Sequence, residues 1–209
     1  QDFERFNNIN FRKDDLGLGV HSEYFKRATV DFNYDRGSRV NYDPGSTLPA
    51  FRGNGTNFNM TLTLRPLSRL KLDEIYFYTQ LHTRPDSFLG LVQGPPVIGQ
   101  ATVFTNHLIR SRLNYQFNRS LSLRVILDYN GTLPNASLTS IDKAKIVTGD
   151  VLLTYLLHPG TAFYVGYTDR LENLGIAPPG ISPTLERLAF PSTTTGRQFF
   201  AKVSYLFRF

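Results

Sequence analysis

The sequence predicts an all-β protein, namely an antiparallel transmembrane β-barrel with eight to ten strands in this chain, either complete or part of a larger barrel. Three observations predict it. Apolar and polar residues alternate along many segments, which is the period of a strand whose two sides face different surroundings. Short turns alternate with long loops, as in outer-membrane barrels, where turns and loops lie at opposite ends. No apolar run approaches the roughly 18 residues of a membrane helix, so a membrane span here must be built from strands.

The N-terminal segment 1–27 is the least regular part of the sequence. From Leu16 the even positions are apolar or small, and they stay in phase as far as Tyr34. This pattern fits one very long strand or two strands with a turn between them. The polar odd positions make 27–36, at least, a two-faced strand.

The remainder, 28–209, predicts eight alternating strands. They are expected near 27–36, 57–65, 70–83, 102–117, 121–130, 143–157, 161–169 and 195–209. Short turns are expected at 66–69, 118–119 and 158–160, and long loops at 40–54, 84–100, 131–143 and 170–194. A change in the phase of the apolar residues within 70–83 predicts a β-bulge near Asp73 and Glu74.

The last strand ends in a specific pattern. From Phe199 the odd positions are apolar, and Tyr205, Phe207 and Phe209 place aromatic rings at alternate positions up to the final residue. This ending resembles the C-terminal assembly signal of bacterial outer-membrane barrels. The resemblance implies the barrel-assembly machinery as a partner and places the short turns at the periplasmic end.

Composition excludes several other classes. The formal net charge of +6 raises the question of nucleic acid, but Lys and Arg are scattered singly and no nucleic-acid motif is present. The absence of cysteine excludes a disulfide framework, thiolate catalysis and Cys-ligated metals. The first residues lack the features of a signal peptide, so we expect a mature chain or a piece of a longer one.

No catalytic or metal-binding motif is present, and we expect no enzyme, no cofactor and no metal site. Some barrel enzymes place Asp, His or Ser at the outer rim. Here His82 and His107 flank a long loop that contains Asp86, but their spacing matches no known arrangement. Structural roles are therefore favoured for these histidines.

The charged residues of the strands carry the more informative pattern. The side chains expected on the inward face are Arg65, Arg110, Arg112, Arg124, Asp128, Asp150, Lys202 and Arg208, together with Asp31 and Asp35. In a barrel of about eight strands the interior holds only side chains, so these charges would form a plug of ion pairs. In a wider barrel the excess of cations would favour anionic solutes.

Several segments between 62 and 209 resemble a bacterial envelope family of unknown function whose full-length members carry an N-terminal domain similar to carbohydrate-binding family 9, followed by an outer-membrane barrel. The segments that carry the resemblance are 64–66 with 69–70, 113–117, 121–124, 158–162 with 164–167, and 204–208. The resemblance implies an outer-membrane location and a chain several times longer. Because the sugar-binding domain is absent, no glycan-binding residues can be assigned.

We therefore expect a barrel in the outer membrane of a Gram-negative bacterium that anchors or scaffolds an envelope complex or a missing extramembrane domain. One alternative is a pore or transporter for small solutes, anionic or sugar-like. The other is a soluble, glycan-binding β-sandwich. The expected partners are outer-membrane lipid, the barrel-assembly machinery, and another chain or a missing N-terminal part that completes the barrel, but not nucleic acid.

Overall fold

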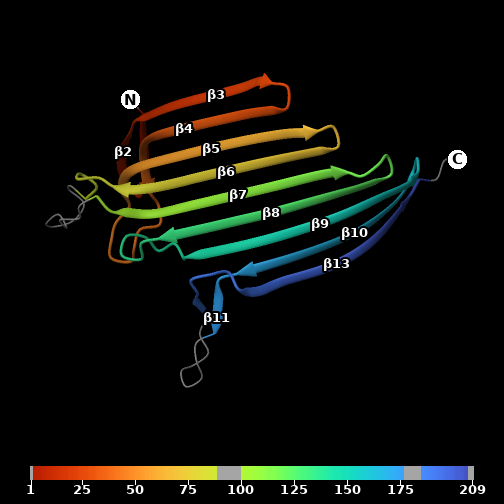
Figure 1. The fold of residues 1–209 in the computed structure, drawn as a ribbon. Helices are drawn as coiled ribbons and strands as arrows, with labels where there is room; N and C mark the ends of the chain where they lie inside the picture. Colours follow the sequence, from red (N-terminus) through yellow and green to blue (C-terminus); the bar gives the residue numbers. More distant parts are fainter. Residues whose placement is uncertain (1, 89–99, 177–184, 207–209) are drawn as a thin grey trace.

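A computed structural model describes residues 2–88, 100–176 and 185–206, and this part of the chain consists of strands and their connections (Figure 1). The strands are β1 (Asp2–Phe6), β2 (Ile9–Lys13), β3 (Asp15–Phe25), β4 (Ala28–Asn41), β5 (Phe51–Leu67), β6 (Leu70–Thr83), β7 (Thr102–Gln116), β8 (Leu121–Pro134), β9 (Ala144–His158), β10 (Thr161–Glu172), β11 (Leu174–Ile176), β12 (Leu185–Arg187) and β13 (Thr193–Tyr205). Within the described ranges no helix is long and apolar enough to cross a membrane.

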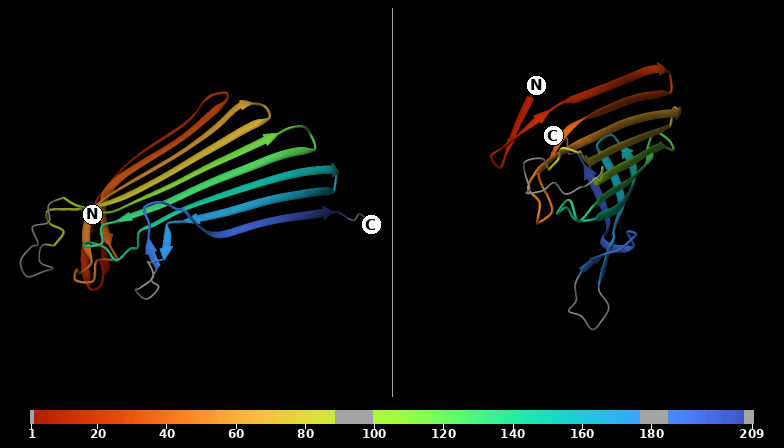
Figure 2. Two further views of the ribbon diagram at one scale, coloured as in Figure 1. Left: turned by 60° about the horizontal axis from the view of Figure 1, so that its bottom comes forward. Right: turned by 90° about the vertical axis from the view of Figure 1, so that its left-hand side faces the viewer.

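Nine strands form one antiparallel sheet in the order β3-β4-β5-β6-β7-β8-β9-β10-β13. It is a single twisted layer in which each long strand pairs with its neighbours in the sequence (Figures 1 and 2). The predicted all-β antiparallel fold is confirmed. A closed barrel is not present among the described residues, because β3 and β13 lie at opposite edges of the sheet and do not pair.

The two edge strands run in the same direction. We call the end of the sheet that carries the short connections the turn end, and the opposite end the loop end (Figure 1). β3 reaches the turn end at Phe25, which pairs with Ala28 across a two-residue turn. β13 also reaches the turn end, where Tyr205 pairs with Thr161. A direct pairing of β3 with β13 would therefore be parallel, unlike every other pair in the sheet.

The short turns follow from their residues. At 118–121 the Asn118 side-chain oxygen accepts hydrogen bonds from the backbone N–H of Ser120 and Leu121, at 2.8 and 2.9 Å, which closes the turn locally. At 158–161 Pro159 precedes Gly160, whose φ is +98°. Proline fixes the first central φ of a tight turn and glycine accepts the positive second one.

The N-terminal segment is more regular than its sequence indicates. β1 and β2 form a hairpin whose turn residues, Asn7 and Asn8, have φ of +46° and +62°; asparagine tolerates this conformation better than most residues. From Leu16 onward there are two strands, β3 and β4, with the turn at Lys26 and Arg27.

The predicted bulge near Asp73 and Glu74 is wrong. β6 pairs without interruption through both residues, and the register shifts instead between Leu64 and Leu67 and between Leu81 and His82. The apolar residues change phase because those early in β6 lie on one face of the sheet and those later in β6 lie on the other. The backbone pairing itself continues without a shift. In Figure 1 the strand runs on smoothly through this region.

Two of the long loops, those expected at 40–54 and 131–143, are shorter than expected because paired strands extend into them, whereas the loop expected at 84–100 keeps its length to within one residue. The connections are 42–50, 84–101 and 135–143. Within 170–194 the chain forms its own hairpin, β11–β12, in place of an unstructured loop. Asn173 anchors this hairpin: its side chain is fully buried, accepts the Lys145 N–H at 2.7 Å and donates to the Leu188 carbonyl at 3.1 Å.

We predict that Asn173→Ala loosens the β11–β12 hairpin. The Lys145 N–H and the Leu188 carbonyl would lose their buried side-chain partner, at about 1–3 kcal/mol for each group left unsatisfied. Amide exchange at Lys145 should accelerate by about tenfold or more, whereas Asn130→Ala, an exposed control on β8, should leave it unchanged. Equal exchange in the two variants would show that Asn173 does not hold the hairpin.

Candidate functional site

The register divides the side chains of the sheet between two chemically different faces. Leu64, Leu72, Leu113, Val125 and Val151 lie opposite one another on β5 to β9, and we call the face on which they lie the apolar face. Side chains alternate between the two faces of a strand. The residue next in sequence to each of these five therefore lies on the opposite face.

The opposite side is the polar face. It is defined by a second row of opposed residues on the same five strands, Thr63, Asp73, Arg112, Ile126 and Asp150. The register places most of the charges that the sequence assigned to an inward surface on this face: Asp31, Asp35, Arg65, Arg110, Arg112, Arg124, Asp128, Asp150 and Lys202. Arg208 lies outside the described residues.

Several charges in the middle of the polar face have direct partners. Arg110 donates two hydrogen bonds to the Asp128 carboxylate, from Nε at 2.6 Å and from Nη2 at 2.9 Å. The Thr168 hydroxyl donates to Asp150 at 2.5 Å. These contacts are the arrangement expected of an ion-paired surface, in which each ionised group has an oppositely charged or hydrogen-bonding partner.

Near the turn end, by contrast, the polar face is strongly cationic. Five basic residues line a hollow of about 710 Å³: Arg27, Arg65, Arg69, Lys71 and Arg124. We call them the turn-end basic cluster. No carboxylate lines the hollow.

The contacts of the cluster do not neutralise its charge. Lys71 pairs with Asp73 at 2.9 Å. Arg27 and Arg69 donate to backbone carbonyls, those of Pro66 and Phe117, each at 3.2 Å. Within the described ranges, the guanidinium groups of Arg65 and Arg124 have no hydrogen-bond or ion-pair partner.

At the loop end, connections from different hairpins pack over the polar face. A buried cluster joins Phe51 and Leu81 of the strands to Phe88 and Leu138 of the loops. The connections 42–50 and 135–143 are also joined directly, because the Gly45 N–H donates to the Leu138 carbonyl at 3.2 Å and the Ser140 N–H donates to the Asp43 carbonyl at 3.0 Å. These loops cover a smaller cavity of about 340 Å³, so the polar face is covered at the loop end and open at the turn end.

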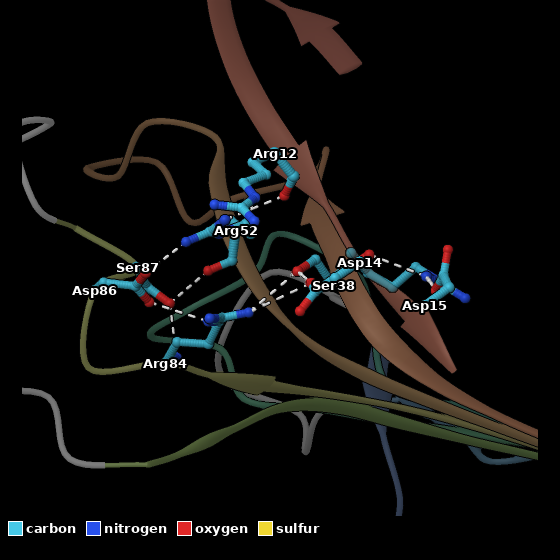
Figure 3. A network of polar contacts seen from close by, with 9 residues as sticks. Arg12, Asp14, Asp15, Ser38, Arg52, Arg84, Asp86 and Ser87 are labelled. Atoms are coloured by element: carbon cyan, nitrogen blue, oxygen red, sulfur yellow. Dashed lines mark hydrogen bonds and ion pairs between the residues drawn. The ribbon is translucent and has the colours of Figure 1, made fainter. Parts of the chain in front are cut away.

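A polar network ties the N-terminal hairpin to the loop end (Figure 3). Arg52 of β5 donates to the Arg12 carbonyl of β2 at 3.1 Å and also pairs with Asp86. Arg84 holds the other Asp86 oxygen at 3.0 Å. Burial alone raises the pKa of the Asp86 carboxyl, but the hydrogen bonds and charges of the two arginines outweigh it and leave the pKa below its ordinary value.

The two histidines of the loop end do not meet Asp86 in a catalytic arrangement. His107 contacts the Tyr76 hydroxyl at 2.8 Å, and His82 contacts Thr102 at 3.3 Å, whereas the partners of Asp86 are the two arginines. Across the described part of the chain, no group of three or more His, Asp or Glu side chains could hold a metal ion.

Of the aromatic ending, Tyr205 is the last residue of β13 and lies on the apolar face. Phe207 and Phe209 lie outside the described residues.

Comparison with known proteins identifies no relative. No family model, no curated protein and no solved structure matches this chain. The resemblance of the segments between 62 and 209 to an envelope family therefore remains a hypothesis.

The sequence analysis missed three members of the turn-end basic cluster. Arg27 was placed at the start of a strand and Arg69 in a turn, and Lys71 was not considered among the inward charges. The signal was present, because basic residues flank each of these turns. Only the pairing of neighbouring hairpins shows that the flanking residues from different turns converge on one hollow.

We predict that Asp86 makes the loop end sensitive to acid. The pKa of Asp86 is depressed in the folded protein from an unfolded value of 3.8, so its contribution to stability is present above that value and is lost as the pH falls through the lower, folded pKa. From about pH 5 to about pH 3, the denaturant midpoint of the wild-type chain in neutral detergent should fall more steeply than that of Asp86→Asn. Parallel pH profiles would contradict the pairing seen in Figure 3.

Proposed function

We propose that the nine-stranded sheet forms part of the wall of a bacterial outer-membrane β-barrel, and that the protein serves there as a non-catalytic anchor or scaffold. The apolar face supports this proposal. Large hydrophobic side chains remain uncovered on it: Leu127 is 54% exposed, Val165 42% and Phe199 69%. An apolar surface of this extent needs a cover in water, and the described residues provide none.

The positions of the aromatic rings support a lipid bilayer as the surroundings of the apolar face. Tyr34, Phe58, Tyr78 and His107 lie directly opposite one another on β4 to β7, toward the loop end. The Tyr78 and His107 rings are in contact, with centroids 5.1 Å apart. A second group lies toward the turn end and consists of Tyr115, Tyr155, Phe163 and Tyr205. Most of the residues between the two groups are aliphatic, as between the aromatic girdles of membrane barrels.

The separation of the two aromatic groups fits a bilayer. On β7, His107 and Tyr115 are eight residues apart, which is about 27 Å along a strand at roughly 3.4 Å per residue. If the strand is tilted by about 40°, the height is about 20 Å, close to the roughly 25 Å of the apolar band of outer-membrane barrels.

From strand to strand, the residues of the loop-side aromatic group lie progressively closer to the turn end. This shift is expected if the strands are tilted relative to the membrane. On β8 the aromatic residue of the loop-side group is Tyr129. It lies opposite Ile109, which is two residues closer to the turn end than His107. On β10 the corresponding residue is Tyr167, opposite Val151 and closer still. A membrane boundary that crosses tilted strands must shift in this manner from strand to strand.

Two polar pairs interrupt the apolar face. Glu74 accepts a hydrogen bond from the Ser111 hydroxyl at 2.5 Å, and Asp169 pairs with Arg197 at 2.9 Å. Ionisable groups facing lipid are costly unless they are paired. Each of these groups has its partner on the adjacent strand, which limits that cost.

The directions of the edge strands determine how such a wall could close. Because β3 and β13 run the same way, antiparallel closure requires an odd number of further strands between them. We propose that another chain, or another part of a longer chain, supplies these strands. A glycan-binding β-sandwich is less well supported, because a sandwich needs a second sheet packed on the apolar face.

We predict that the chain, refolded into detergent micelles, migrates differently on a gel before and after boiling and partitions into the detergent phase. Folded membrane barrels resist unfolding by detergent at room temperature, and their apolar faces bind it. Identical migration in both states, together with partition into the aqueous phase, would contradict the proposal and favour a soluble sheet.

Adjacent residues on β8 allow a matched test of the lipid-facing side. Leu127 lies on the apolar face and Ile126 on the polar face. In lipid vesicles Leu127→Lys should destabilise the protein by about 2–4 kcal/mol, the cost of a lysine near the bilayer midplane, whereas Ile126→Lys should cost far less. Unfolding by denaturant in vesicles measures both. A smaller loss for Leu127→Lys than for Ile126→Lys would place the membrane on the wrong face.

A further inference from the structure

The turn-end basic cluster gathers residues from neighbouring hairpins around one hollow. The Arg65 N–H bonds to the Arg27 carbonyl at 2.8 Å. Lys71 lies opposite Asn114, which lies opposite Arg124. Adjacent strands are about 4.8 Å apart, so Arg27 and Arg65 are close neighbours on one side of the hollow, and Lys71, Asn114 and Arg124 follow one another across β6 to β8 on the other.

Such a group of cations is unfavourable unless something neutralises it. Like charges on neighbouring strands repel one another. Asp73 is the nearest acid, and it is already engaged by Lys71 at 2.9 Å and by the Thr63 hydroxyl at 2.7 Å. On the same face and strand as Asn114, Arg112 has a buried Nε with no hydrogen-bond partner.

Two arginines of the cluster, Arg27 and Arg69, are held in place with donors to spare. Arg27 and Arg69 each use one N–H on a backbone carbonyl, and a guanidinium has five N–H donors. Fixing part of a side chain beforehand reduces the entropy lost when a ligand binds. The hollow of about 710 Å³ falls within the range of small-molecule sites, roughly 300–1,000 Å³.

We propose that the turn-end basic cluster binds a small soluble solute that carries two or more phosphate groups. Arginine matches the geometry of phosphate with paired hydrogen bonds, and several cations around one hollow suit more than one phosphate. Leu70, Tyr115 and Leu123 of the apolar face also border the hollow, so a phospholipid headgroup would offer the same phosphate chemistry, and the experiment below separates the two sources. This inference goes beyond the proposed anchor function and does not depend on it.

The test uses the full chain in neutral detergent micelles, titrated calorimetrically with sodium tripolyphosphate. Arg65→Gln and Arg124→Gln should each weaken binding about tenfold or more, because each loses a charge-assisted contact. Arg36→Gln is the matched control: it removes the same charge from an exposed position nearer the loop end and should change affinity by less than about twofold. Raising the salt concentration should weaken binding steeply.

Three results would overturn the proposal: no saturable binding to the wild-type chain, an equal loss in Arg36→Gln, or binding to phosphatidylglycerol vesicles but not to tripolyphosphate. Gel migration before and after boiling, measured for each variant, reports folding separately from binding. If the wild-type chain binds tripolyphosphate but migrates identically on a gel before and after boiling, the result supports the binding site and contradicts the barrel proposal. The reverse result would retain the barrel and remove the site.

Discussion

The continuous antiparallel backbone ladder is the constraint on which the rest of this structure depends. Once neighbouring strands are hydrogen-bonded in register, every side chain is committed to one of two faces, and a slip by one residue would exchange them. The register runs from β3 to β13 with few irregularities. The same backbone hydrogen bonds therefore determine both the rows of aromatic residues on the apolar face and the ion pairs on the polar face.

The ladder also explains why polar chemistry gathers at the two ends of the sheet. In the middle, a charge can meet a partner directly across the strands, as Arg110 meets Asp128. At the turn end the strands stop at basic residues from successive hairpins, and the cations outnumber the acids, of which Asp73 pairs with Lys71. At the loop end the longer connections reach one another, and the pairing of Asp86 with Arg52 and Arg84 ties them to the N-terminal hairpin.

A single layer with two exposed faces and two open edges is not a self-sufficient soluble fold. Soluble sheets cover an apolar face with another layer, and exposed edges invite pairing with other strands. Lipid on one face, and further strands at β3 and β13, would satisfy both needs together. In the proposed arrangement the polar face would line an aqueous interior, where the cationic hollow would be open to a solute.

Alternation along the chain was sufficient to determine the all-β class, the antiparallel meander and the two-faced strands, because period two is a local property of the backbone. It misplaced the bulge at Asp73 and Glu74 because hydrophobicity is an imperfect marker of face: Glu74 lies on the apolar side and Phe77 on the polar side. The hairpin at 174–187, the loop packing around Leu138 and the convergence of Arg27, Arg65 and Arg124 were decided by tertiary structure. Each depends on pairings between residues far apart in the chain, which no local pattern records.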